Sequence, residues 1–174
     1  MRAIGKGSLA SILAMGLHFT RSIIAVGFFG LTIAMVVVPF VPLIVGTVDG
    51  IPGVNIDADI DAGVSAGDFI GVAHHFVTFG VMLFVVNRLL EILKTLRFGS
   101  PFVRENADRF RGVGYALLIG EGAKFAFLLL SAIFDADIDI NSTAIAWLAI
   151  IAVFVLSEVF REGARMKEEQ DLTV

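Results

Sequence analysis

The chain lacks cysteine and has few charged side chains. None of its 174 residues is Cys, and only 17% are Asp, Glu, Lys or Arg. Without cysteine it can form neither a disulfide framework nor a thiolate metal site, and it has no thiol nucleophile. Its histidines, His18, His74 and His75, form no H-E-x-x-H motif, and no phosphate-binding loop is present. We therefore predict that the protein is not an enzyme and carries no cofactor.

Hydrophobic residues, by contrast, are abundant. They make up 57% of the chain and give a mean hydropathy of +0.88, whereas a soluble domain is about half apolar and about a quarter charged. Four segments have close to the roughly 20 apolar residues that a bilayer crossing requires. We expect one membrane domain, residues 1–174, with spans at about 22–48, 69–90, 110–134 and 144–162 and a tail at 163–174. Residues 3–20 are expected to form a juxtamembrane or interfacial helix that leads into the first span.

Basic residues occur in alternate connections between these spans. The N-terminus, the link between the second and third spans, and the tail contain every Lys and Arg except Lys124, whereas residues 49–68 and 135–143 contain none. Lys and Arg mark the cytoplasmic side of a membrane protein. The sequence therefore predicts an all-α integral membrane protein, a four-transmembrane-helix bundle of up-down-up-down topology with both termini in the cytoplasm.

The acidic pentapeptide DADID occurs in both outer connections. Its alternation of Asp with apolar residues has the period of a strand, so we expect a short acidic extracytoplasmic strand pair, or loops. The alternative is a divalent-cation site, but an EF-hand loop has Gly where this chain has Ala62 and Ile140. We therefore predict no metal site. The candidate ligands of that alternative are Asp57, Asp59, Asp61, Asp135, Asp137 and Asp139, with His74 and His75 nearby.

Three charged residues inside the expected spans are candidates for an intramembrane role: Glu121, Lys124 and Glu158. Glu121 and Lys124 lie three residues apart and share a helix face; each isolated charge would cost about 2.5–3.5 kcal/mol at the bilayer centre. They form either a proton relay or ion-coupling pair, or an internal ion pair that fixes the rotation of the helix. Glu158, near the inner end of the last span, can pair with Arg161 or Arg88. 

Small residues mark one face of the third span. Gly112, Ala116 and Gly120 recur every four residues, and such a stripe lets helices approach closely. It allows a homo-oligomer. In the link before this span, Ser100 fits a helix N-cap and Pro101 the first helical position, so we expect the third helix to begin near Pro101.

The tail is expected to continue the fourth span as a helix to about Gln170. Its basic residues precede its acidic ones, against the preference of the helix dipole for cations at the C-terminus. This order favours a basic partner surface that meets the acidic end. The predicted partner-binding residues are Arg161, Glu162, Arg165, Glu168, Glu169, Gln170 and Asp171.

Two stretches resemble a known family. EVFREGARMKEEQDLTV, residues 158–174, and GSPFVRENADRFRGVG, residues 99–114, are similar to the closing and central motifs of the bacterial membrane family called domain of unknown function 2975. The resemblance implies four helices with cytoplasmic ends in the bacterial inner membrane, and no established activity. Members are often encoded beside a small helix-turn-helix regulator of the Cro/C1 type, which implies a regulatory pairing by association.

Two functions remain open at this point. The first is a regulatory or sensory membrane anchor that holds a soluble partner, with a small helix-turn-helix regulator as the candidate, through the cytoplasmic hairpin and the tail; no direct nucleic-acid binding is expected. The alternative is a small ion-coupled transporter or channel subunit that uses Glu121 and Lys124.

Overall fold

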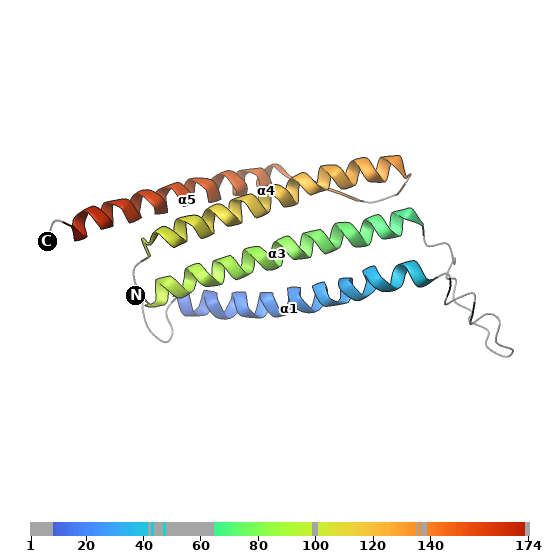
Figure 1. Ribbon diagram of the computed structural model, residues 1–174, viewed down its shortest axis with the longest axis horizontal. Helices are drawn as coiled ribbons and strands as arrows, with labels where there is room; N and C mark the ends of the chain where they lie inside the picture. The colour runs from blue at the N-terminus through green and yellow to red at the C-terminus, as the bar shows by residue number, and fades with distance from the viewer. Residues whose placement is uncertain are drawn as a thin grey trace.

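The computed structural model describes residues 9–41, 43, 47, 65–98, 101–134, 136 and 139–172, and every regular element among them is helical. The elements are α1 (Leu9–Val37), the short 3-10 helix η1 (Val38–Phe40), α3 (Ala66–Phe98), α4 (Arg104–Ile133) and α5 (Ala144–Asp171) (Figure 1). Four helical segments, Ala10–Phe40, Gly67–Leu96, Arg104–Ile133 and Ala144–Asp171, are long and apolar enough to cross a membrane. The predicted all-α protein with four spans is confirmed. The DADID segments, apart from Ala136 and Asp139, lie outside the described residues, so the strand pair stays a prediction.

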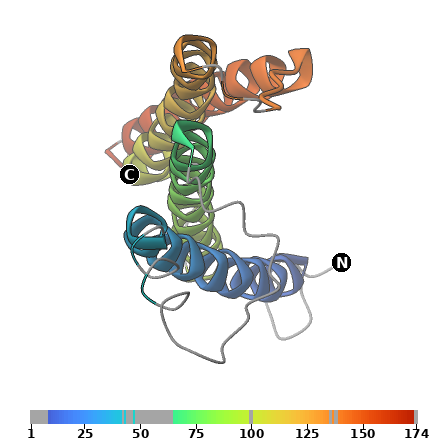
Figure 2. The ribbon, with the colours of Figure 1, turned by 90° about the vertical axis from the view of Figure 1, so that its right-hand side faces the viewer.

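The long helices lie side by side in the order of the chain. α3 packs against α1 on one side and α4 on the other, and α5 packs against α4. Each helix runs antiparallel to the one before it (Figure 1). Viewed end-on, α1 and α5 occupy opposite ends of an open row, with α3 and α4 between them (Figure 2). The outward faces of α1 and α5 are therefore left to lipid or to another chain.

The open row of helices explains why few side chains are buried. Most apolar side chains of the spans stay exposed, as lipid-facing side chains do, and the small core lies along the helix contacts. Its buried hydrophobic residues are Ile24, Ile70, Val86, Ile92, Ala107, Val113, Ile150 and Ala164. The small-residue stripe of α4 is used inside the chain: Gly120 faces Val81 of α3, and Gly112 faces Phe84. These glycines let α3 and α4 approach closely.

The structure tests two expectations about helix limits, and the start expected for the third helix was wrong. The juxtamembrane or interfacial helix expected at residues 3–20 leads directly into the first span, since α1 runs unbroken from Leu9 through Thr20 and no proline interrupts this stretch. α4 begins at Arg104 rather than near Pro101, and Val103 before it is extended, with φ −120° and ψ 145°. The extended Val103 follows Phe102, whose ring packs against α5. This tertiary contact overrides the local preference of proline for a first helical turn.

α5 begins beside the middle of α4 and not beside its end. The hydroxyl of Ser142, two residues before α5, donates a hydrogen bond to Glu121, whereas α4 continues to Ile133. Residues 139–143 therefore run beside α4 before α5 starts (Figure 1). Thr143 is the N-cap of α5, and its side chain accepts a hydrogen bond from the backbone N–H of Ala146. This cap satisfies one of the donors that a helix start leaves open.

Replacing Gly163 should show how much the close contact between α5 and Phe102 contributes to stability. A Cβ at this position would lie 2.5 Å from Cδ1 of Phe102, so we expect Gly163→Leu to lower the free energy of unfolding by about 1–3 kcal/mol. Gly122→Leu is the matched control, because a Cβ there meets nothing within 4 Å. Denaturant unfolding in detergent measures both. Equal stability of the two variants would contradict the packing of Phe102 on α5.

Candidate functional site

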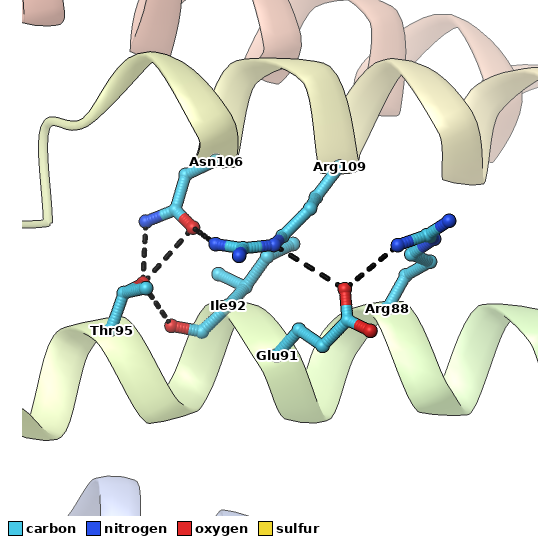
Figure 3. Close-up of polar contacts among 6 residues, drawn as sticks. All are labelled: Arg88, Glu91, Ile92, Thr95, Asn106 and Arg109. Carbon is cyan, nitrogen blue, oxygen red and sulfur yellow. Dashed lines mark hydrogen bonds and ion pairs between the residues drawn. The ribbon is translucent and has the colours of Figure 1, made fainter.

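The turn between α3 and α4 is organised by one buried amide, the side chain of Asn106 (Figure 3). Asn106 is 0% exposed. Its Nδ2 donates to Thr95 Oγ1 at 2.7 Å and to the backbone oxygen of Pro101 at 2.9 Å. Its Oδ1 accepts from Nη1 of Arg109 at 2.8 Å. The Thr95 hydroxyl donates to the backbone oxygen of Ile92 at 2.7 Å. We call Thr95, Pro101, Asn106 and Arg109 the turn network.

An ion-pair bridge continues this network along α3. Glu91 Oε2 lies 2.9 Å from Nη1 of Arg88 on the same helix and 3.3 Å from Nε of Arg109 on α4 (Figure 3). One carboxylate therefore meets two guanidinium groups. Arg88, which was one of two candidate partners for Glu158, pairs with Glu91 instead.

The start of α4 is fastened to α5 by aromatic packing and one buried hydrogen bond. The ring of Phe160 lies 5.5 Å from that of Phe102 and 4.8 Å from that of Phe110, between ring centroids. Ser157 is buried, and its hydroxyl donates to the backbone oxygen of Ala107 at 2.9 Å. The two motif stretches, residues 99–114 and 158–174, thus meet in space at this end of the molecule.

The last two turns of α5, residues 165–171, form what we call the α5 end. Gly163 lies opposite Phe102, just before the start of α4, so the α5 end continues beyond α4 (Figure 1). Its charges pair along the helix: Arg165 Nη2 lies 2.6 Å from Glu162, and Arg165 Nε lies 3.6 Å from Glu169. Arg161 pairs with Glu158. Such pairs support a helix that has little packing of its own.

The predicted partner-binding residues all lie on α5 and are exposed. They are Arg161, Glu162, Arg165, Glu168, Glu169, Gln170 and Asp171. The structure places them on one exposed helical segment, and it pairs Arg161 and Arg165 with neighbouring carboxylates. A soluble partner would thus meet an ordered helix that carries charges of both signs.

Glu121 and Lys124 form an ion pair that reaches the start of α5. Lys124 Nζ lies 2.6 Å from Glu121 Oε1 and 3.2 Å from the backbone oxygen of Asn141. Glu121 Oε2 accepts from the hydroxyl of Ser142 at 2.9 Å, and Trp147 Nε1 donates to the same hydroxyl oxygen at 3.2 Å. Only 8% of Glu121 is exposed. Both carboxylate oxygens are bonded, so the pair fastens the segment before α5 to the middle of α4.

The two neighbouring histidines of α3 differ in their surroundings. Nδ1 of His75 lies 2.8 Å from the backbone oxygen of Gly71. Both ring nitrogens of His74 are buried without a hydrogen-bond partner, and the ring lies against Phe127 of α4 at 5.4 Å between centroids. His74 is thus the one histidine with an unmet polar demand among the residues that the structure describes.

The cation-site alternative receives no further support from the described part of the chain. Nowhere in it do three or more His, Asp or Glu residues lie together as a metal site would require. Of its six candidate aspartates, Asp139 is described, and Asp57, Asp59, Asp61, Asp135 and Asp137 lie outside the described residues.

Sequence reasoning missed the turn network. Thr95 is an ordinary polar residue near the end of a helix, and the resemblance of residues 99–114 assigned no role to Asn106 or Arg109. A signal was nevertheless present, since an asparagine placed two residues after Arg104 can face the turn that precedes the helix. Only the fold shows that Asn106 is fully buried.

Removing the Asn106 amide should destabilise the turn. Asn106→Ala removes the hydrogen bonds of the amide to Thr95, Arg109 and the oxygen of Pro101, so we expect the free energy of unfolding to fall by about 1–3 kcal/mol. Asn141→Ala is the control, because this asparagine is exposed and exposed substitutions usually change stability by at most about 0.5 kcal/mol. Unfolding in detergent compares the two, and similar values for both would argue against the network.

Comparison with known proteins identifies the family of the chain. The family described as "Protein of unknown function (DUF2975)" matches residues 62–174, which include α3, α4 and α5. No curated protein matches the chain, and no solved structure does. The matched region contains both motif stretches that meet at the turn network and α5. The chain therefore belongs to the DUF2975 family, as the resemblance of these stretches implied.

Proposed function

We propose that the protein is a multi-pass anchor in the bacterial inner membrane that holds a soluble regulatory partner through the α3–α4 turn and the α5 end. The observation that carries this proposal is the continuation of α5 beyond the start of α4 as an exposed, charged helix (Figure 1). Membrane spans need no such extension, because the apolar part of α5 ends before Glu158. An ordered charged helix outside the bilayer is suited to bind a protein.

The base of this helix is rigid. Ser157 bonds to Ala107, Phe160 packs between Phe102 and Phe110, and Gly163 lies against Phe102. A partner that binds the α5 end is therefore connected through these contacts to the start of α4 and to the turn network. This coupling offers a route by which events within the membrane domain could alter the binding of the partner.

The charge distribution supports a cytoplasmic position for this end. Apart from Lys124, the basic residues of the described chain lie towards the end of the row that holds the α3–α4 turn. The positive-inside rule assigns such an end to the cytoplasm, and with it both termini. A soluble cytoplasmic protein would thus have access to the α5 end.

The chemistry of the α5 end favours a basic partner. Glu168, Glu169 and Asp171 are exposed and outnumber the basic residues of the α5 end, Arg165 and Lys167. The acidic residues come last on the helix, so we propose no direct contact with nucleic acid. A small helix-turn-helix regulator, which needs a basic surface for DNA, is the partner that we propose; neither a cofactor nor an enzymatic step is needed.

Reversing the acidic charges should release the partner. We expect the triple variant Glu168→Lys, Glu169→Lys, Asp171→Lys to recover about tenfold less of a basic DNA-binding protein, which corresponds to about 1.4 kcal/mol. The measurement is a mild-detergent pull-down of the tagged full-length chain from its native cell, with quantitative mass spectrometry.

Lys167→Glu is the matched control, because it alters a charge in the same turns but makes them more acidic. It should retain the partner or bind it more strongly. Truncation at residue 162 is a poorer test, since it also removes Gly163 from Phe102. Equal recovery of the partner with the wild type and the triple variant would refute a role for the α5 end, and recovery of the chain as a homo-oligomer alone would favour the candidate below.

A second candidate function is a small ion-coupled transporter or channel subunit that uses Glu121 and Lys124. The observation in its favour is His74, whose ring nitrogens are buried without a partner on the helix that neighbours this ion pair. Ionisable groups inside membrane spans frequently serve proton or ion pathways. The ion pair and His74 would then be parts of one pathway between α3 and α4.

The transport candidate predicts that Glu121→Gln abolishes a proton or cation flux. The substitution keeps the shape of the side chain but removes the charge that faces Lys124. Flux into proteoliposomes of the purified chain is the measurement, and Glu158→Gln, which neutralises an exposed carboxylate, is the control. Absence of flux from the wild type, or an unchanged flux in Glu121→Gln, would exclude this function for the pair.

A further inference from the structure

A groove between α1 and α3 is lined by a combination of basic and apolar residues that neither proposed function uses. Its volume is about 590 Å³. We call it the α1–α3 groove. Its lining residues are Ala10, Ala14, His18 and Arg21 of α1 and Asn87, Leu90, Glu91, Leu93 and Lys94 of α3.

The groove is built by the spacing of residues on both helices. Ala10, Ala14 and His18 follow one another at intervals of four on α1, so they share a face. Leu90 and Lys94 repeat the same interval on α3. The two alanines leave room where larger side chains would fill the space between the helices. The open volume therefore belongs to the helix pair itself.

The charge of the groove is positive. Neither Arg21 nor Lys94 has an ion-pair partner among the described residues. The one carboxylate in the lining, Glu91, is already shared by Arg88 and Arg109 at 2.9 and 3.3 Å. Two cations are thus left to face an open cavity, with the amide of Asn87 as a further donor.

The geometry points to a binding site for the phosphate headgroup of an anionic phospholipid in the α1–α3 groove, with Arg21 and Lys94 as its cationic ligands. A guanidinium binds phosphate oxygens bidentately, and an ammonium adds a point charge. Basic pockets between membrane helices bind anionic headgroups in this way. The site would hold α1, which contacts no other long helix as extensively as α3, against the rest of the row.

A lipid suits the groove better than free phosphate because apolar surface adjoins the cations. Ala10, Ala14, Leu90 and Leu93 form the apolar part of the lining. On neighbouring faces of α1, the side chains of Met15, Phe19 and Ile23 are exposed and offer a surface for acyl chains. Free phosphate would gain nothing from these contacts, whereas a phospholipid would use both parts.

The test compares lipid binding by matched variants of the purified full-length chain. Native mass spectrometry in neutral detergent counts bound phosphatidylglycerol, with phosphatidylcholine as the zwitterionic reference. We expect Arg21→Gln/Lys94→Gln to lower the apparent affinity for phosphatidylglycerol about tenfold or more, since each cation near an anionic headgroup contributes several-fold. Arg104→Gln/Lys167→Gln removes the same charge outside the groove and should bind as the wild type does.

Two further variants separate the site from general effects on folding or charge. Ala14→Leu fills the groove without altering charge and should also weaken binding, whereas Arg21→Lys/Lys94→Arg keeps both charges and should retain it. Equal binding of phosphatidylglycerol by the wild type and the glutamine variant would overturn the proposal, as would equal loss in the Arg104/Lys167 variant. Displacement of phosphatidylglycerol by millimolar inorganic phosphate would show that the groove binds free phosphate. This result would also overturn the proposal.

Discussion

The turn between α3 and α4 depends on the complete burial of one amide, the Asn106 side chain. A buried amide is tolerated only when its donors and acceptor are bonded, and here Thr95, Pro101 and Arg109 meet that demand. Through these bonds the amide joins Thr95 in the last turn of α3 to Pro101 and to the first turns of α4. Through Arg109 it also brings a guanidinium to Glu91.

The same turn determines the position of α5. Because Phe102 precedes α4 in an extended segment, its ring projects onto Phe160 and Gly163 instead of lying on the surface of a helix. α5 can approach closely there only because residue 163 is glycine. The exposed α5 end is thus oriented by the segment that joins the turn network to α4, the neighbouring helix.

Hydropathy and charge were sufficient to predict the four helices and their antiparallel order, because long apolar runs and basic links are properties of local sequence. They could not predict the start of α4. The preference of Pro101 for a first helical turn is a local effect, and the contact of Phe102 with α5 involves residues about 60 positions away in the chain. The burial of Asn106 and the α1–α3 groove likewise depend on neighbours that spacing alone does not identify.

For the candidate site residues too, local sequence predicted contacts within one helix but not contacts between segments. The spacing of Glu121 and Lys124 correctly placed them on one helix face, and the structure joins them at 2.6 Å. Their contacts with Asn141 and Ser142 could not be predicted, because no local signal indicates that α5 begins beside the middle of α4. The two alternatives for this pair must therefore be weighed from its surroundings.

Those surroundings favour a structural role. From Arg111 to Ile133, α4 rises about 33 Å, close to the thickness of a hydrocarbon core, whereas α5 from Ala144 to Glu158 rises only about 21 Å. The segment before α5 then lies at a depth where non-helical backbone needs protein partners. Lys124 bonds to the backbone oxygen of Asn141, and Glu121 bonds to Ser142.

Glu121 and Lys124 hold the segment before α5 through Ser142 and Asn141. A change in the charge of either residue would weaken these hydrogen bonds. In a transport role, each protonation of Glu121 would therefore weaken its ion pair with Lys124 and loosen the contacts that hold residues 141 and 142. The anchor role requires no such loosening, because the pair then serves only to hold the short span of α5 in place. The unpartnered His74 is the one feature that the structural role leaves unexplained.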